Sequence, residues 1–97
     1  MRKVRISEVV WDKIDELVDY LVDEFKLSEE AAIRRIDRLM NFLADLGNPV
    51  DYALCRFKRW RSLGYRCAVF EYWVFVYEIF DGGVIVHDMA HSSTLTE

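Results

Sequence analysis

The chain has 97 residues, 53% of them hydrophobic, and a formal net charge of -4. This length and apolar content suit one core, so we expect residues 1–97 to form a single domain, and no run approaches the ~20 apolar residues that a membrane-spanning helix requires. The net negative charge argues against non-specific binding of nucleic acid over the whole surface, because a polyanion is repelled unless positive charge is concentrated locally.

The first predicted elements are a short strand and an amphipathic helix. Residues 3–7 alternate between polar and apolar side chains, which is the pattern of a half-buried strand. From Glu8 the apolar residues recur at steps of three and four, which predicts a helix with Ser7 as its N-cap. Its apolar stripe consists of Val10, Ile14, Leu17, Val18, Leu21, Val22 and Phe25.

A second helix is predicted to begin after Ser28, where Glu29 and Glu30 follow a residue suited to capping. Its apolar stripe runs until Gly47-Asn48-Pro49 ends it. The connection at Lys26-Leu27 is so short that the two helices must be antiparallel neighbours. Their joint apolar face then needs a sheet to cover it.

The C-terminal half predicts that sheet. Residues 65–71, 73–80 and 84–89 are rich in β-branched and aromatic side chains, and Asp81-Gly82-Gly83 is a turn between the last two runs. The middle run is apolar on nearly both faces, which predicts a central strand with helices on one side and a partner or substrate on the other. Residues 51–62 fit neither period. The expected class is therefore α+β: an N-terminal strand, a two-helix hairpin and a three-stranded antiparallel sheet.

Charge is distributed unevenly along the chain. Residues 8–24 contain seven acids and one lysine, whereas residues 56–66 contain five basic residues and no acid. The basic segment predicts either contact with nucleic-acid phosphates, a solvated basic edge, or a surface for a protein partner. It comprises Arg56, Lys58, Arg59, Arg61 and Arg66.

Cys55 and Cys67 do not form a CxxC pair, and the N-terminus does not resemble a signal peptide. We therefore expect a cytoplasmic protein in which both cysteines are core thiols, and neither is predicted to be a nucleophile.

His87 and His91 are the two histidines of the chain. Four residues along a regular strand span about 13 Å, too far for one ion to bridge, so we expect no metal site unless the strand bulges, and nothing in the sequence indicates a cofactor.

The end of the chain, Tyr77-Glu78-Ile79-Phe80-Asp81-Gly82-Gly83-Val84-Ile85-Val86-His87-Asp88-Met89-Ala90-His91, resembles the RelE/ParE superfamily of toxins from type II toxin-antitoxin systems. The Gly64-Tyr65-Arg66 segment is similar to the glycine-aromatic-arginine start of a sheet strand in these proteins. The resemblance implies a toxin that a cognate antitoxin neutralises by binding across the helices and sheet. RelE-like members cut messenger RNA in the ribosomal A site, whereas ParE-like members inhibit DNA gyrase.

The resemblance also implies candidate site residues. Arg66 stands where RelE-like members carry a phosphate-binding arginine, and His91 where some ribonucleolytic members place a general acid or base. Lys58, Arg59 and Arg61 are candidate phosphate contacts, and Trp60 is a candidate for stacking on a base. Two positions depart from the family pattern, because Ser92 follows His91 where a tyrosine is usual, and Val74 falls near the usual arginine. An endoribonuclease, a gyrase inhibitor and a non-catalytic interaction module with the toxin fold therefore all remain open.

Overall fold

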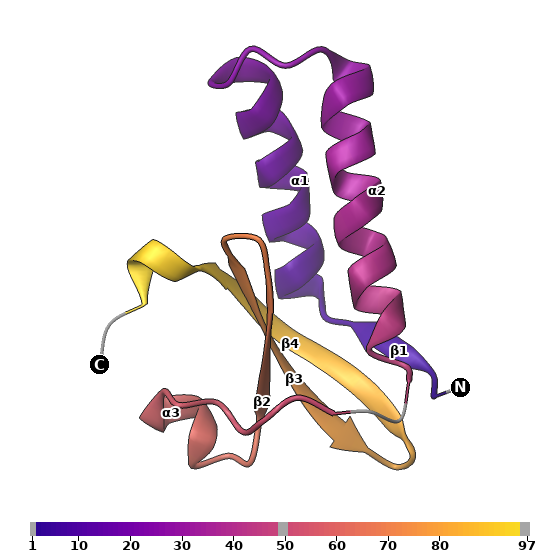
Figure 1. The fold of residues 1–97 in the computed structure, drawn as a ribbon, viewed down its shortest axis with the longest axis vertical. Coiled ribbons are helices and arrows are strands. Elements are labelled where there is room, and N and C mark those ends of the chain that lie inside the picture. Colours follow the sequence, from indigo (N-terminus) through magenta and orange to yellow (C-terminus); the bar gives the residue numbers. More distant parts are fainter. Residues whose placement is uncertain (1, 49–50, 96–97) are drawn as a thin grey trace.

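The computed structural model describes residues 2–48 and 51–95. Its elements are, in order, β1 (Val4–Ile6), α1 (Glu8–Asp23), α2 (Glu29–Asp45), α3 (Lys58–Arg61), β2 (Arg66–Phe70), β3 (Trp73–Phe80), β4 (Gly83–His91) and the 3-10 turn η1 (Ser92–Thr94). All four strands form one sheet in the order β1-β4-β3-β2 (Figure 1). The fold is α+β, as the sequence predicts.

The sheet is mixed rather than purely antiparallel. β1 pairs in parallel with β4, with Val4 opposite Val84, so the expected three-stranded sheet has a fourth strand. β2, β3 and β4 are antiparallel neighbours, as expected. The side chains of Val4 and Ile6 pack against the main core, and this packing stabilises the pairing of the short strand β1 with β4.

Both predicted helix caps are confirmed. The Ser7 hydroxyl accepts the Val10 N–H, and the Ser28 hydroxyl accepts the Ala31 N–H. The two helices form the expected hairpin, which stands against the sheet near β1 and β4 and projects well beyond the strands at its connecting loop (Figure 1). Part of its apolar stripe is therefore not covered by the sheet.

The main core lies between the hairpin and one face of the sheet. α1 and α2 contribute buried aliphatic side chains, and Phe75 and Met89, opposite each other in register, are fully buried beneath them. Phe42 on α2 packs against Phe70 and Phe75 at ring-centroid distances of 4.9 and 5.9 Å. The buried members are Val10, Ile14, Leu39, Leu43, Leu46, Ala68, Phe75, Tyr77, Val84, Val86 and Met89.

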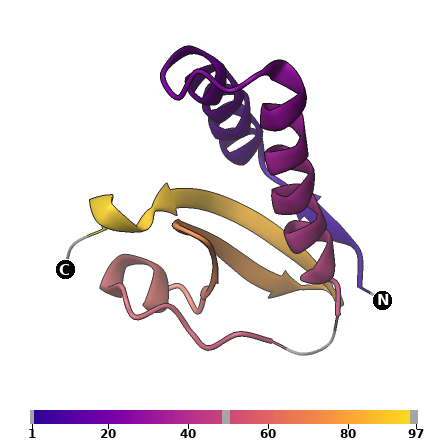
Figure 2. The ribbon, with the colours of Figure 1, turned by 45° about the horizontal axis from the view of Figure 1, so that its top comes forward.

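The opposite face of the sheet is covered by residues 51–65, here called the strap. Figure 2 shows the strap and α3 on the side of the sheet away from the helical hairpin. Phe57 and Trp60 of the strap form a second buried cluster with Cys55 and Val76. The expectation that this face of β3 receives a partner or substrate is wrong at Val76, because the chain covers it with its own segment.

The strap is joined covalently to β2. Cys55 and Cys67 form a disulfide with an S–S distance of 2.06 Å, so the expectation of two core thiols is also wrong. The strap folds back beside β2, where Leu54 lies opposite Arg66 and the Cys67 N–H donates to the Ala53 carbonyl at 3.3 Å. This reversal brings together cysteines that lie 12 residues apart in the chain.

Among residues 2–48 and 51–95, no helix is both long and apolar enough to cross a membrane.

Candidate functional site

A half-open cavity of about 580 Å³ lies where the hairpin projects past the sheet. Its walls are α1, the chain just after it, α2, the tip between β2 and β3, and the end of β4 with η1. We call this cavity the hairpin groove. Most of its lining is apolar, and the apolar members are Leu17, Tyr20, Leu21, Phe25, Ile36, Leu39, Phe70, Tyr72 and Trp73.

The rim of the groove carries exposed aromatic rings. Tyr20 is 50% exposed, Phe25 57% and Tyr72 67%, although all three line the same cavity. Tyr20 and Phe25 meet edge to face, with ring centroids 5.2 Å apart. Large apolar surfaces that are grouped and left open in this way are typical of protein-binding sites.

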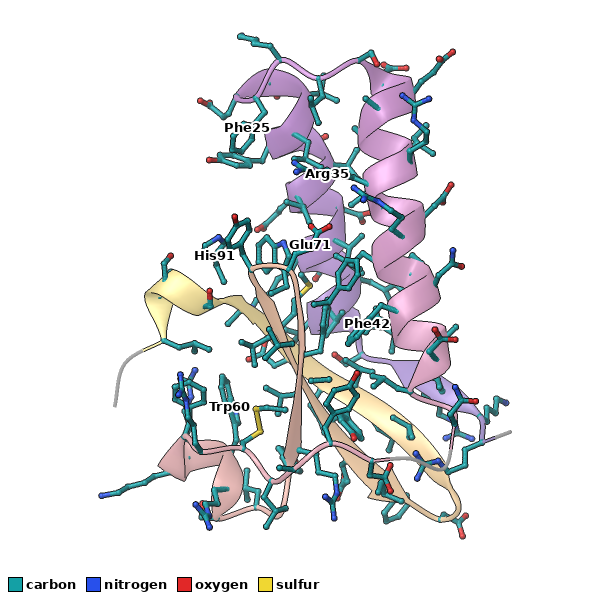
Figure 3. The ribbon with its side chains drawn as sticks, in the orientation of Figure 1. Phe25, Arg35, Phe42, Trp60, Glu71 and His91 are labelled. Atoms are coloured by element: carbon teal, nitrogen blue, oxygen red, sulfur yellow. A yellow bond between two sulfur atoms is a disulfide. The ribbon has the colours of Figure 1, made fainter. Side chains whose placement is uncertain are left out.

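Four polar residues complete the lining. One is Ser93 in η1, and Figure 3 shows the other three on different elements: Arg35 on α2, Glu71 at the tip between β2 and β3, and His91 at the end of β4. Glu71 has a positive φ of 55° in the tight turn and lies 3.9 Å from the Arg38 guanidinium. One acid, one arginine, one imidazole and one hydroxyl thus belong to an otherwise apolar lining.

His91 is held by its neighbours at the mouth of the groove. Its ring stacks on Tyr72 at a centroid distance of 5.9 Å and meets Trp73 edge to face at 5.3 Å. Nδ1 accepts the Ser93 N–H at 3.2 Å and lies 2.7 Å from the Ser93 hydroxyl. Because Nδ1 is an acceptor, the proton of the neutral ring is on Nε2. Among the described residues, no carboxylate is hydrogen-bonded to this imidazole.

Arg66 lies in a different part of the sheet and has a structural contact. Its guanidinium donates to the Tyr52 carbonyl at 2.6 Å and so ties the start of the strap to β2. In register, Arg66 pairs with Tyr77, whereas His91 pairs with Trp73. Four residues along a strand and two strand spacings across the sheet separate their backbones by roughly 16 Å. The structure does not bring the two predicted catalytic residues together.

The basic residues of α3 do not surround an open aromatic platform. Trp60 is only 7% exposed and belongs to the second buried cluster. The guanidinium of Arg59 lies 4.1 Å from the centre of the Trp60 ring, and that of Arg56 lies 5.2 Å from the centre of the Phe57 ring. A base cannot stack on a ring that is buried and covered in this way. Arg59, Arg61 and Lys58 remain on the exposed side of the short helix, close in sequence to Arg66.

His87 lies at an irregularity of the sheet that the sequence does not predict. The register between β3 and β4 shifts between Val76 and Tyr77, which leaves His87 without a direct partner. Its Nε2 is 2.8 Å from the Glu78 carboxylate, and its ring stacks on Tyr65 at 4.6 Å. No group of three or more His, Cys, Asp and Glu side chains suited to hold a metal ion occurs within the part of the chain that the structure describes.

The groove is the feature that the sequence analysis missed. Phe25 is the last residue of the apolar stripe on the first predicted helix, and Tyr20 lies beside that stripe. Their position beyond the end of the sheet depends on the tertiary arrangement. The available signal was the aromatic pair at the end of an otherwise aliphatic stripe.

A scan against models of protein families finds no match to this chain, and a search of curated proteins also finds none.

Proposed function

We propose that this chain is a RelE/ParE-type toxin that inhibits growth by binding a target protein such as DNA gyrase, without cleaving RNA, and that a cognate antitoxin neutralises it by occupying the hairpin groove. The proposal combines the resemblance in the C-terminal half with the α+β arrangement of one strand, two helices and the sheet. It assigns the inhibitory activity to surfaces and not to a catalytic centre.

The observation that carries this choice is the separation of Arg66 from His91. Cleavage of RNA requires a cation on the reacting phosphate and an acid or base within hydrogen-bond reach of the same nucleotide. The register places these two residues roughly 16 Å apart, and Arg66 is engaged by the Tyr52 carbonyl. Because the Arg66 guanidinium is held by the Tyr52 carbonyl and the His91 ring by Ser93, the two side chains are not arranged around one phosphodiester.

The groove supplies the surface for the antitoxin. Tyr20, Phe25 and Tyr72 each leave half or more of their surface in solvent at its rim. Covering apolar area stabilises a complex by about 25 cal/mol per Å², so three half-exposed aromatic rings are a substantial source of affinity. Arg35 and Glu71 are positioned to orient the bound segment.

The test is induced expression in a bacterium that lacks the partner, followed by two assays on the purified protein. We expect growth arrest, inhibition of gyrase supercoiling, and no cleavage of messenger RNA on programmed ribosomes. Ribosomal A-site cuts that disappear in Arg66→Ala would overturn the non-catalytic mechanism. Normal growth with a folded protein would overturn the toxin function as a whole.

A second candidate is a non-catalytic interaction module that has the toxin fold but inhibits nothing. The net charge of -4 and the absence of a joint Arg66–His91 site favour it. It predicts normal growth on induction together with a stable complex through the groove, so growth separates the two candidates and complex formation does not.

A further inference from the structure

The Cys55–Cys67 disulfide connects two segments with different exposure. Cys55 belongs to the strap and is fully buried in the second cluster. Cys67 belongs to β2, an edge strand of the sheet, and is only partly buried. Because an attacking thiolate must reach a sulfur atom, we expect attack at Cys67, the more exposed of the two residues, and not at Cys55.

The disulfide closes a loop that is largely self-contained. Within residues 56–64, the N–H groups of Trp60 and Arg61 donate to the Phe57 carbonyl, and that of Gly64 donates to the Arg61 carbonyl. Both partners of each of these bonds lie within the loop, so the bonds do not depend on contact with the sheet. Docking depends on the Phe57 and Trp60 side chains against Val76, on the backbone hydrogen bonds at residues 53–55, and on the disulfide at Cys55.

We propose that Cys55–Cys67 is a reversible thiol–disulfide exchange site, opened by a thiolate that attacks Sγ of Cys67, and that its oxidation state sets whether the basic loop of residues 56–64 is held against the sheet. The proposal is independent of what the toxin-like domain binds, and it goes beyond the function proposed above.

The exchange is balanced by a dithiol reductant. Its first thiolate forms a mixed disulfide with Cys67 and releases Cys55 as a thiolate, which takes a proton from water. Its second thiolate then attacks the reductant's own sulfur in that mixed disulfide, closes a cyclic disulfide, and releases Cys67, which is also protonated. Two electrons and two protons pass from the dithiol to the protein.

Opening the bond changes the loop more than the sheet. A cross-link over 12 residues restricts the open conformations of the loop, and this restriction is lost on reduction. Residues 56–64 carry Arg56, Arg59 and Arg61, so a change in docking moves positive charge relative to the sheet. The strands stay paired because their hydrogen bonds do not involve the loop.

Hydrogen exchange of the whole chain, with and without dithiothreitol, tests the local character of this change. We expect exchange in residues 53–64 to rise about tenfold or more on reduction, with little change in β3 and β4. The Cys55→Ala/Cys67→Ala variant should exchange at the fast rate with or without the reductant. An equal rise throughout the sheet, or no rise in the loop, would overturn the proposal.

The site of attack is tested with glutathione, acid quenching and alkylation of the released thiol. Trypsin separates the two cysteines, because Arg56 follows Cys55 and Arg66 precedes Cys67. We expect glutathione on the peptide that begins at Cys67 and the alkyl group on the peptide that ends at Arg56. Glutathione mainly on Cys55, or a bond that resists reduction until the protein unfolds, would contradict the assignment.

A matched pair of variants tests the role of docking. Trp60→Phe weakens the packing of the loop against the sheet. Leu63→Ala changes an apolar side chain of the same loop that is 60% exposed. We expect reduction to become several-fold faster in the first and to stay within about twofold of the parent rate in the second. Equal rates in all three proteins would show that loop docking does not control the exchange.

Discussion

Arg66 and His91 lie on the two strands that flank β3, but at register positions four residues apart. Arg66 is fixed by the Tyr52 carbonyl at one end of the sheet, and His91 is packed between Tyr72 and Trp73 at the other. Arg66 and His91, which the sequence predicts to act on one phosphate, therefore make their contacts at two separate places in the fold.

The first prediction concerns these two residues. We expect Arg66→Ala and His91→Ala each to retain growth inhibition, because neither belongs to a shared catalytic centre. Arg66→Ala should lower the free energy of unfolding by about 1 kcal/mol through loss of its bond to Tyr52. Growth curves on induced expression and chemical denaturation measure both effects. Loss of toxicity in both variants, with the fold intact, would restore the ribonuclease mechanism.

The second prediction separates neutralisation from toxicity. Phe25→Ala and Tyr72→Ala remove exposed rings from the rim of the groove, and each should weaken antitoxin binding by about tenfold or more. The matched control is Phe80→Ala, which removes a ring that is 60% exposed at the other end of β3. Co-expression with the cognate antitoxin that the proposal predicts should rescue growth of the control but not of the groove variants. Equal rescue of all three would exclude the groove.

The third prediction concerns acid stability. The Arg2 guanidinium donates to Asp51 at 2.6 Å, and this hydrogen bond holds the pKa of Asp51 below its ordinary value. A carboxyl whose pKa is lower in the folded protein stabilises it above the unfolded-state pKa of about 3.9, and this contribution is lost as the pH falls through the folded pKa. Both side chains are partly solvated, so the contribution is at most about 1 kcal/mol.

Asp51→Asn measures that contribution directly. The parent protein should be the more stable of the two near pH 7, and the difference should shrink below about pH 4 as the carboxyl is protonated. Urea denaturation at several pH values gives the two curves. A difference that is unchanged between pH 7 and pH 3 would show that the ion pair is not its cause.

The fourth prediction concerns the attachment of the strap near its start. The Tyr77 hydroxyl is buried with its residue and accepts the Tyr52 N–H at 2.9 Å, and burial raises the pKa of this phenol. Tyr77→Phe should lower the free energy of unfolding by about 1 kcal/mol. Tyr72→Phe, at an exposed position, should change it by less than about 0.5 kcal/mol. Equal effects in the two variants would contradict a specific role for the Tyr77 bond.

The parts of the fold that the sequence predicts are those determined locally. Ser7 and Ser28 cap their helices because each side chain reaches the N–H three residues later, and the turn at Asp81-Gly82 uses two residues with positive φ. Alternation and helical spacing likewise predict the hairpin and the three C-terminal strands.

The parts that the sequence does not predict depend on distant contacts. β1 has three residues, too few to specify whether it pairs in parallel or antiparallel fashion. The strap has no regular period because its path is determined by Cys55, Phe57 and Trp60 against the sheet. The groove exists because the helical hairpin extends past the ends of the strands. The hydrophobic periodicity of the sequence does not predict this difference in extent.

Hydrogen exchange of the chain, alone and with the cognate antitoxin that the proposal predicts, tests the central claim most directly. The account predicts new protection in the groove walls, at residues 17–25, 35–39 and 70–73, while residues 56–64 exchange as before. Protection confined to residues 56–64, with the groove walls unchanged, would contradict it.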